Sequence, residues 1–547
     1  MTKNSPTGAK NWLTYLVFFI RAKKSDRLLG YLTLLIGSII VTLWTIFRFA
    51  TKSINFDLVG QQLLSRQWLD GNLEGSVTAP TNYILKMATL YMPSDILAID
   101  PKLFLMLSTI CINIATFAGL YFILKLILKY FSVKPGAFFN VSMLWLAMVA
   151  GSVFWIQFTN SRNLELVAGL FVIYLGLLIY RKVTPLKCTA FTILAGLTYF
   201  ADPMQLMVTS VILVTFILAD SLFLQKDKAS HGKSLLIIFL VAVGYVLSLG
   251  LVHFVKHITN VEFFTVSSLS QSLAVFSNLP TAAIETGKNI LRLTAGTNEM
   301  GVWRQVLSLL LVLVLSGLAA YSLIWKKSYR KYASLTLFIS IALIVPIGVY
   351  VASGQPLFQV DTSRYVIVLA PALVLLFSVL DMHLLPSVLR QATLIGACAI
   401  VTIGAGSLLL STVNAAPKGL LASDSIEARY LYLQENSYTY GYASMDTSIP
   451  AMYLFGKNKE EVLLPLSCDA SGLRKATLFF DRAVFLKNEG KQVEVPIILD
   501  GDAIGNYPNK CDQEAIRKQL GDPTRIDRSH ENIILIYSDD VTARLGY

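Results

Sequence analysis

Apolar residues fall in long, uninterrupted blocks along most of this chain, and polar residues gather between the blocks. The first block, LLGYLTLLIGSIIVTLWTIFRF over residues 28–49, is long enough to cross a bilayer as a helix, which needs ~20 apolar residues. Ten later blocks have a similar character. We therefore predict eleven membrane-spanning helices, near residues 28–49, 103–127, 138–158, 164–181, 186–200, 204–224, 233–254, 305–325, 333–352, 365–381 and 391–412.

Composition supports a polytopic membrane protein rather than a soluble one. Of the 547 residues, 54% are hydrophobic and only 15% are charged, whereas soluble domains carry ~25% charged residues. The apolar stretch at residues 11–20 is too short to span, ends in basic residues and lacks a cleavage site for a signal peptide. We interpret residues 1–27 as a cytoplasmic N-terminus with an interfacial helix.

The distribution of basic residues predicts the orientation of the chain. The net charge is +12, yet residues 415–547 hold 15 basic and 19 acidic residues, so the surplus lies in the first 414 residues. It gathers in the N-terminus and in the second, fourth, sixth and eighth loops, which fits the positive-inside rule better than nucleic-acid binding. The N-terminus is then cytoplasmic and the C-terminal tail lies outside the cell membrane. Without the span at 186–200, every later loop would lie on the opposite side of the membrane. The basic loops before and after this span are all cytoplasmic only if the span is kept.

Three segments are predicted to share the exterior side: the loops 50–102 and 255–304 and the tail 415–547. Loops of this length in compact proteins are usually functional. The tail is water-compatible, with TLFFDRAVFL and NIILIYSDD expected as strands and CDQEAIRKQLGDP as a short helix. We expect an all-α membrane domain over residues 28–414 and a small α+β domain over residues 415–547.

The five cysteines are too few for a disulfide scaffold. Cys111, Cys188 and Cys398 lie in spans and are interpreted as packing residues. Cys468 and Cys511 both fall in the exterior domain, where a disulfide is chemically allowed. A disulfide and two free thiols are both possible for this pair, because sequence does not show whether their Cα atoms approach within ~7 Å.

Two exterior positions hold charges that could carry chemistry next to early spans. Asp57 immediately follows the first span, and a carboxylate there is either a solvated loop acid or a base that takes a proton from a nucleophile. Arg162 and Glu165 are spaced i, i+3 and therefore share one face of the first turn of the fourth span. Ordinary capping explains Glu165 equally well, whereas Arg162 at that depth needs an acid or a phosphate.

Further charged positions lie on the same predicted side. Asp202 precedes a proline and is a good helix N-cap, which does not prevent it from lining a site. Asp361 and Arg364 precede the tenth span, where Arg364 suits phosphate binding but also serves as an interfacial anchor. His257 in the loop 255–304 is retained as a site candidate, although a histidine beside a lysine is commonly a solvated surface group. Nothing in that loop has metal-ligand spacing.

Together these motifs resemble the GT-C superfamily of integral-membrane glycosyltransferases, which use polyprenyl-phosphate-linked sugars. The resemblance rests on the acid after the first span, the long first exterior loop, the RNxE motif at Arg162 to Glu165, the Asp-Pro junction at Asp202 and the SRYV sequence that contains Arg364. The branch of protein O-mannosyltransferases and bacterial aminoarabinose transferases of lipid A is most similar. The tail segment SYTYGYASMDTSIPAMYLFGKNKEEVLLP also resembles the exterior tail of bacterial members.

The resemblance implies a role for each matching residue. Asp57 would be the general base for the acceptor, Arg162 and Glu165 would organise the active site, and Arg364 would lie near the donor phosphate. Asp202 matches only loosely. The tail lacks a WWDYG-like stretch, which disfavours an oligosaccharyltransferase with a metal-bound pyrophosphate donor. We expect no cofactor, and a divalent metal stays open.

The implied activity is inverting transfer of a sugar from a polyprenyl-phosphate donor to an exterior protein, lipid or glycan acceptor. Membrane lipids are expected to surround the donor tail, and no nucleic-acid partner is expected. Two other functions stay open: a transporter or flippase of a lipid-linked glycan, and a non-catalytic scaffold of the cell envelope. Transporters usually place their charges at the bilayer midplane within repeated halves, whereas these charges gather on one side and no repeat is visible.

Overall fold

The structure is a computed structural model of the whole chain. It describes residues 25–51, 56–69, 77–79, 91–97, 99–150, 163–225, 227–259, 261–263, 278–295, 302–324, 332–352, 367–382, 385–415, 424–456, 460–469, 472–478, 480–488, 492–505, 510–529, 532–538 and 541–546.

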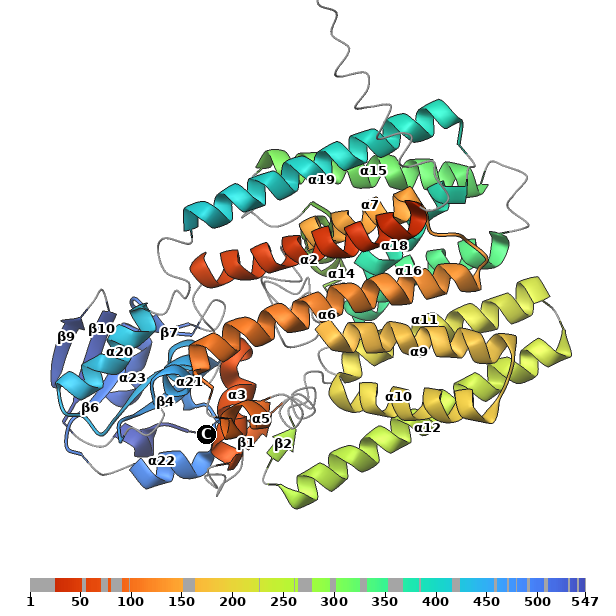
Figure 1. The fold of residues 1–547 in the computed structure, drawn as a ribbon. Coiled ribbons are helices and arrows are strands. Elements are labelled where there is room, and N and C mark those ends of the chain that lie inside the picture. The colour runs from red at the N-terminus through yellow and green to blue at the C-terminus, as the bar shows by residue number, and fades with distance from the viewer. Residues whose placement is uncertain are drawn as a thin grey trace, which may run out of the picture.

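A bundle of long apolar helices forms most of the molecule (Figure 1). Every predicted span coincides at least in part with a helix, and eight of the described helices are long and apolar enough to cross a membrane. The chain is thus a mostly helical, multi-pass membrane protein. The bundle helices are α2 (Ser25–Thr51), α6 (Pro101–Tyr130), α7 (Ala137–Trp145) with η2 (Leu146–Ala150), α9 (Asn163–Arg181), α10 (Pro185–Ala201), α11 (Pro203–Ala219) with η3 (Asp220–Gln225), α12 (Lys228–Ile258), α15 (Val302–Ile324), α16 (Ala333–Ala352), α18 (Leu369–Ser378) with η7 (Val379–Met382) and α19 (Ser387–Ala415).

Capping side chains mark where several of these helices begin. Asp100 precedes Pro101 and accepts a hydrogen bond from the Leu103 backbone N–H at 2.8 Å, so α6 has both an N-cap and a proline in its first turn. The short helix α7 is capped from a distant part of the chain. The Asp381 carboxylate accepts hydrogen bonds from the backbone N–H groups of Gly136, Phe138 and Phe139 at 2.8, 2.9 and 3.0 Å.

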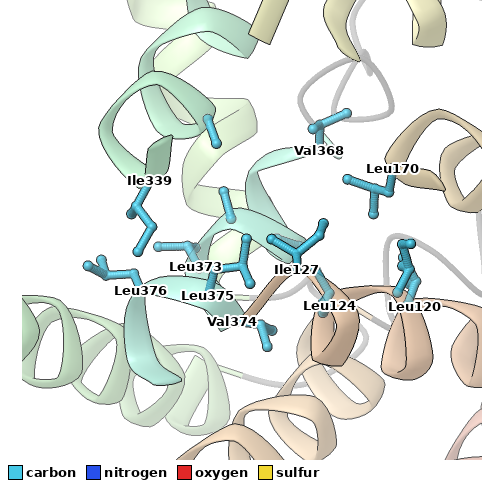
Figure 2. Packing of buried hydrophobic residues seen from close by; sticks show 14 of the residues in the cluster. Leu120, Leu124, Ile127, Leu170, Ile339, Val368, Leu373, Val374, Leu375 and Leu376 are labelled. Atoms are coloured by element: carbon cyan, nitrogen blue, oxygen red, sulfur yellow. The ribbon is translucent and has the colours of Figure 1, made fainter. Parts of the chain in front are cut away.

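Helix α18 lies in the middle of the bundle. All ten of its residues are buried, as expected for a helix that is apolar on every side. Figure 2 shows Leu124 and Ile127 of α6 packing near Val374 and Leu375 of α18. The core therefore holds together helices that are far apart in the sequence.

The two long loops predicted on the exterior side contain regular structure and meet each other. The first holds α3 (Phe56–Leu69), β1 (Val77–Ala79) and α5 (Met92–Ile96), and the second holds β2 (Val261–Phe263) and α14 (Leu279–Ala295). Strands β1 and β2 pair in parallel, with Val77 opposite Val261 and Ala79 opposite Phe263. The two loops therefore share one end of the bundle.

The C-terminal part is a mixed sheet with helices, drawn beside the end of the bundle in Figure 1. The six strands lie in the order β5-β4-β3-β6-β10-β9, and β3 runs parallel to both β4 and β6. The strands are β3 (Tyr440–Ser444), β4 (Val462–Asp469), β5 (Gly472–Lys475), β6 (Val495–Ile498), β9 (Arg525–Ser529) and β10 (Asn532–Tyr537); the helices are α20 (Asp424–Glu435), α21 (Met445–Leu454), α22 (Arg482–Asn488) and α23 (Gln513–Leu520).

A disulfide joins two parts of this domain. Cys468 of β4 is bonded to Cys511 of β8 (Cys511–Asp512), with their Cα atoms 5.7 Å apart, and β8 pairs with β7 (Ala503–Ile504). The sequence left this pairing open.

Two of the three elements expected in the tail are confirmed, and one is wrong. NIILIYSDD contains β10, and CDQEAIRKQLGDP contains α23, which is capped by Asp512. The segment TLFFDRAVFL instead contributes to α22. The buried Asp481 carboxylate accepts a hydrogen bond from the Ala483 N–H at 2.8 Å, which starts a helical turn where a strand was expected.

Candidate functional site

Helix α3 is the centre of the candidate site, because it connects the first span to the sheet domain. Asp57 is its second residue, at the helix end that favours negative charge. The Asp57 side chain lies outside the described residues, so the structure gives only its backbone position. Its predicted role as a base remains a prediction.

The stretch after Asp57 is helical, and the middle of this helix is buried. Every residue from Val59 to Arg66 is buried. Helix α3 packs against α21 of the sheet domain and against α5, which cover it on more than one side (Figure 1). Its polar residues are therefore inside the molecule.

Three buried polar side chains on α3 have unusual surroundings. Gln61, one helical turn after Asp57, is fully buried, and Gln62 and Ser65 are nearly so. Within the described residues, neither amide atom of Gln61 has a hydrogen-bond partner, and the Ser65 hydroxyl also lacks one. Burying such a group without a partner costs ~1–3 kcal/mol, and exceptions of this kind call for an explanation such as a ligand site.

Tyr91 connects α3 to two other elements. It is fully buried where α5 begins, and its ring meets Phe104 edge-on with centroids 6.1 Å apart. Burial raises the pKa of its hydroxyl strongly, the nearby Gln62 amide lowers it, and the negative charge of Glu165 raises it further. The Gln62 contact falls short of full hydrogen-bond geometry. Tyr91 thus remains a neutral hydroxyl between α3, α9 and α21.

The structure brings two of the predicted acids to this end of the bundle. Glu165 lies in the first turn of α9, is buried, and is close enough to Tyr91 to affect its hydroxyl. Asp202 is buried at the junction where α10 ends and α11 begins. Its neighbour Phe200 packs edge-on against Phe263 of β2, with centroids 6.4 Å apart, so the junction lies beside the paired loops.

Two buried arginines were missed by the sequence analysis. Arg48, in the last turn of α2, has only 6% of its surface exposed. Its signal in the sequence is a cation inside an apolar span, which usually marks a functional or paired position. Arg66 of α3 donates a hydrogen bond to the Tyr453 carbonyl at 2.8 Å, covers the Tyr453 ring at 4.7 Å and pairs with Asp95 at 3.5 Å.

Other predicted site residues are not joined to this cluster by the structure. Arg162, Asp361 and Arg364 lie outside the described residues, so their predicted roles are unchanged. His257 is exposed in the last turn of α12, which extends further than the predicted span. Among the described residues, no group of three histidine, cysteine or acidic side chains gathers as a metal site.

The buried amides offer both hydrogen-bond donors and hydrogen-bond acceptors without a formal charge. Glutamine amides donate and accept hydrogen bonds, so they match sugar hydroxyls, which do both. One hydrophobic cluster contains Phe49, Val59, Leu105, Phe200 and Tyr453, and it therefore joins the ends of α2, α3, α6 and α10 to the sheet domain. The buried polar groups lie in a setting of low polarity, where their interactions are strong.

Comparisons with known proteins give a likeness of architecture only. No protein-family model matches the chain, and no curated protein matches it. Among solved structures, the chain is similar to ArnT from Cupriavidus metallidurans, crystallised with undecaprenyl phosphate, with 11% identity over 94% of this chain and 98% of that chain. The TM-score is 0.47, so the function has to be argued from this chain's own residues.

Proposed function

We propose that this protein is a membrane glycosyltransferase that moves a sugar from a polyprenyl-phosphate donor to an acceptor outside the cytoplasm. The observation that carries the proposal is the buried helix α3, which has Asp57 in its first turn and holds enclosed amides between the bundle and the sheet domain. A flippase needs a path across the bilayer, whereas these polar groups gather at one end of the bundle.

The reaction would be a direct displacement. An acceptor hydroxyl attacks the anomeric carbon while the bond from that carbon to the phosphate oxygen breaks. The hydroxyl proton goes to the Asp57 carboxylate, and the lipid phosphate leaves with the electron pair. A single attack inverts the anomeric centre, and one base is sufficient for it.

The other residues would stabilise charge and position the sugar. The leaving phosphate gains negative charge, which Arg48, Arg162 and Arg364 would stabilise electrostatically. Glu165 would orient one of these cations, and Gln61 and Gln62 would bind the sugar hydroxyls. The apolar surface between the spans would hold the lipid tail.

The test is sugar transfer in proteoliposomes. The purified protein would be supplied with a panel of polyprenyl-phosphate sugars and a membrane extract as the acceptor source. We expect Asp57→Asn to lower the transfer rate by ~10²–10⁴-fold, as is typical for loss of a general base. Asp502→Asn, which changes an exposed acid of the sheet domain, should transfer at the rate of the unmodified protein. Equal rates for both variants would remove Asp57 from the mechanism, and no transfer with any donor would contradict the proposed function.

A further inference from the structure

A second polar site lies at the opposite end of the bundle. A cavity of about 290 Å³ is formed where α6 and α9 end, where η3 follows α11 and where α16 begins. Helix α6 has 30 residues and rises ~45 Å, so this cavity is far from α3, which lies near the other end of α6. None of its lining residues takes part in the proposed transfer.

A buried acid forms part of the cavity wall. Asp220 is 1% exposed and accepts hydrogen bonds from the Tyr180 hydroxyl at 3.1 Å and the Ser334 hydroxyl at 2.5 Å. Each bond uses a different carboxylate oxygen, and an ionised carboxylate has about four acceptor sites, so capacity for a further donor remains. An acid within a membrane-spanning segment is costly and is by default a functional position.

The backbone around the acid is irregular in two places. Asp220 begins the π-helical turn η3, and such turns are frequent at functional sites. Ser132, which also lines the cavity, has a φ of 60°, a left-handed conformation that costs free energy for a residue with a side chain.

The rest of the lining is mostly aromatic and includes one cation, together with Gln225 and Leu335. The rings of Tyr130, Tyr180 and Tyr332 line the cavity together with two phenylalanines, and the exposed Arg181 contributes a guanidinium group. Aromatic faces and a carboxylate attract an organic ammonium group, whereas a guanidinium binds phosphate oxygens. A ligand that suits both groups carries a positive ammonium and a negative phosphate close together.

We propose that this cavity binds a phosphoethanolamine group, with its ammonium at Asp220 and the tyrosine rings and its phosphate at Arg181. A simple anion would be repelled by Asp220. A metal cation would gain few ligands here, because the phenylalanine and tyrosine rings do not coordinate it. The cavity lies at the ends of spanning helices, where lipid headgroups lie, so phosphatidylethanolamine is one source of the group and a soluble phosphoethanolamine compound is the other. Its volume is just below the ~300–1,000 Å³ usual for small-molecule pockets.

The test is lipid binding to the purified full chain, followed by native mass spectrometry. Short-chain phosphatidylethanolamine and phosphatidylglycerol would be titrated separately, and the former should bind about tenfold more tightly. Asp220→Asn should abolish this preference, whereas Asp227→Asn, an exposed acid nearby that does not line the cavity, should retain it. Arg181→Gln should weaken binding of both lipids by about tenfold, and the neighbouring Lys182→Gln should not.

The two sources of the ligand are separated by competition. If soluble glycerophosphoethanolamine displaces the lipid, the headgroup alone is sufficient; if it does not, the acyl chains contribute and the lipid is the ligand. A wild-type protein without preference for the ethanolamine lipid would overturn the proposal. Equal behaviour of Asp220→Asn and Asp227→Asn would overturn it too. Because Arg181 is exposed, its variant remains informative even if Asp220→Asn fails to fold.

Discussion

At the scale of single residues, Gln61 is buried although no hydrogen bond within the described residues compensates for it. Its amide is enclosed and has no partner among the described residues, so replacing it with an apolar side chain removes a cost rather than a bond. We expect Gln61→Leu to unfold at the same temperature as the unmodified protein or above it, because up to ~1–3 kcal/mol of desolvation cost is relieved. Its rate of sugar transfer should nevertheless fall by about tenfold or more, because the amide would no longer bind the sugar.

The matched control for Gln61 is Gln67→Leu. Gln67 lies on the same helix and is partly exposed, and only its Oε1 atom is buried without a partner, so the change should lower the transfer rate much less than Gln61→Leu does. The two measurements are thermal unfolding in detergent and the transfer assay. A lower unfolding temperature for Gln61→Leu with normal transfer would show that the amide is structural.

Candidate site residues were predictable from sequence only where a charged residue lies next to an apolar span. Glu165 and Asp202 were recognised as acids at helix starts, and the structure buries both near α3 and the paired loops. Gln61 and Tyr91 gave no such signal, because an uncharged side chain in a polar segment looks like a solvated one. Their importance depends on the cover provided by the sheet domain, which lies far away in the sequence.

At the scale of elements, the short helix α7 depends on a cap from η7. Its first N–H groups would otherwise lack partners, and the Asp381 carboxylate satisfies three nearby groups at once. We expect Asp381→Ala to lower the free energy of unfolding by about 1–3 kcal/mol, measured by chemical denaturation in mixed micelles. Asp381→Asn, which keeps one acceptor oxygen, should have an intermediate effect. Equal stability of all three proteins would contradict the assigned cap.

Elements were predictable where one pattern dominated. Long apolar blocks identified the bundle helices, because a spanning helix needs ~20 predominantly apolar residues. The tail was harder, since short segments are decided by single contacts such as the Asp481 cap of α22. The burial of α3 was not predictable for a similar reason, because α21, which packs against it, comes from a distant part of the chain.

At the scale of the whole molecule, Arg66 ties the sheet domain to the first exterior loop, which is connected to the bundle. It is buried and contacts both Tyr453 of α21 and Asp95 of α5. Breaking a buried ion pair by removing one partner usually costs 3–5 kcal/mol, and for Arg66→Met we expect about 3 kcal/mol. The backbone amides of α21 should then exchange hydrogen faster, since local opening becomes less costly.

The control for Arg66 is a surface pair at the same interface. Lys102 lies 3.8 Å from Glu427, and both side chains are more than a third exposed. Lys102→Met should change hydrogen exchange in α21 very little, because such pairs contribute ~0–1 kcal/mol. Unchanged exchange in Arg66→Met would mean that apolar contacts alone hold the domain in place.

The orientation of the whole molecule in the membrane is the premise of the proposed function, and it can be measured with its own cysteines. In a variant with Cys111, Cys188 and Cys398 replaced by alanine, mild reduction frees the disulfide of the sheet domain. A membrane-impermeant maleimide should then label Cys468, the less buried of the two freed thiols, in intact cells, because the positive-inside rule predicts that domain outside.

The opposite side needs a cysteine where the rule predicts cytoplasm. Lys228→Cys, in a variant without any other cysteine, places an exposed thiol at the start of α12, the helix whose far end leads to β2. It should be labelled only after the membrane is opened. The reverse pattern would put α3 and the sheet domain in the cytoplasm, and a transfer site there could not serve an acceptor outside the cell.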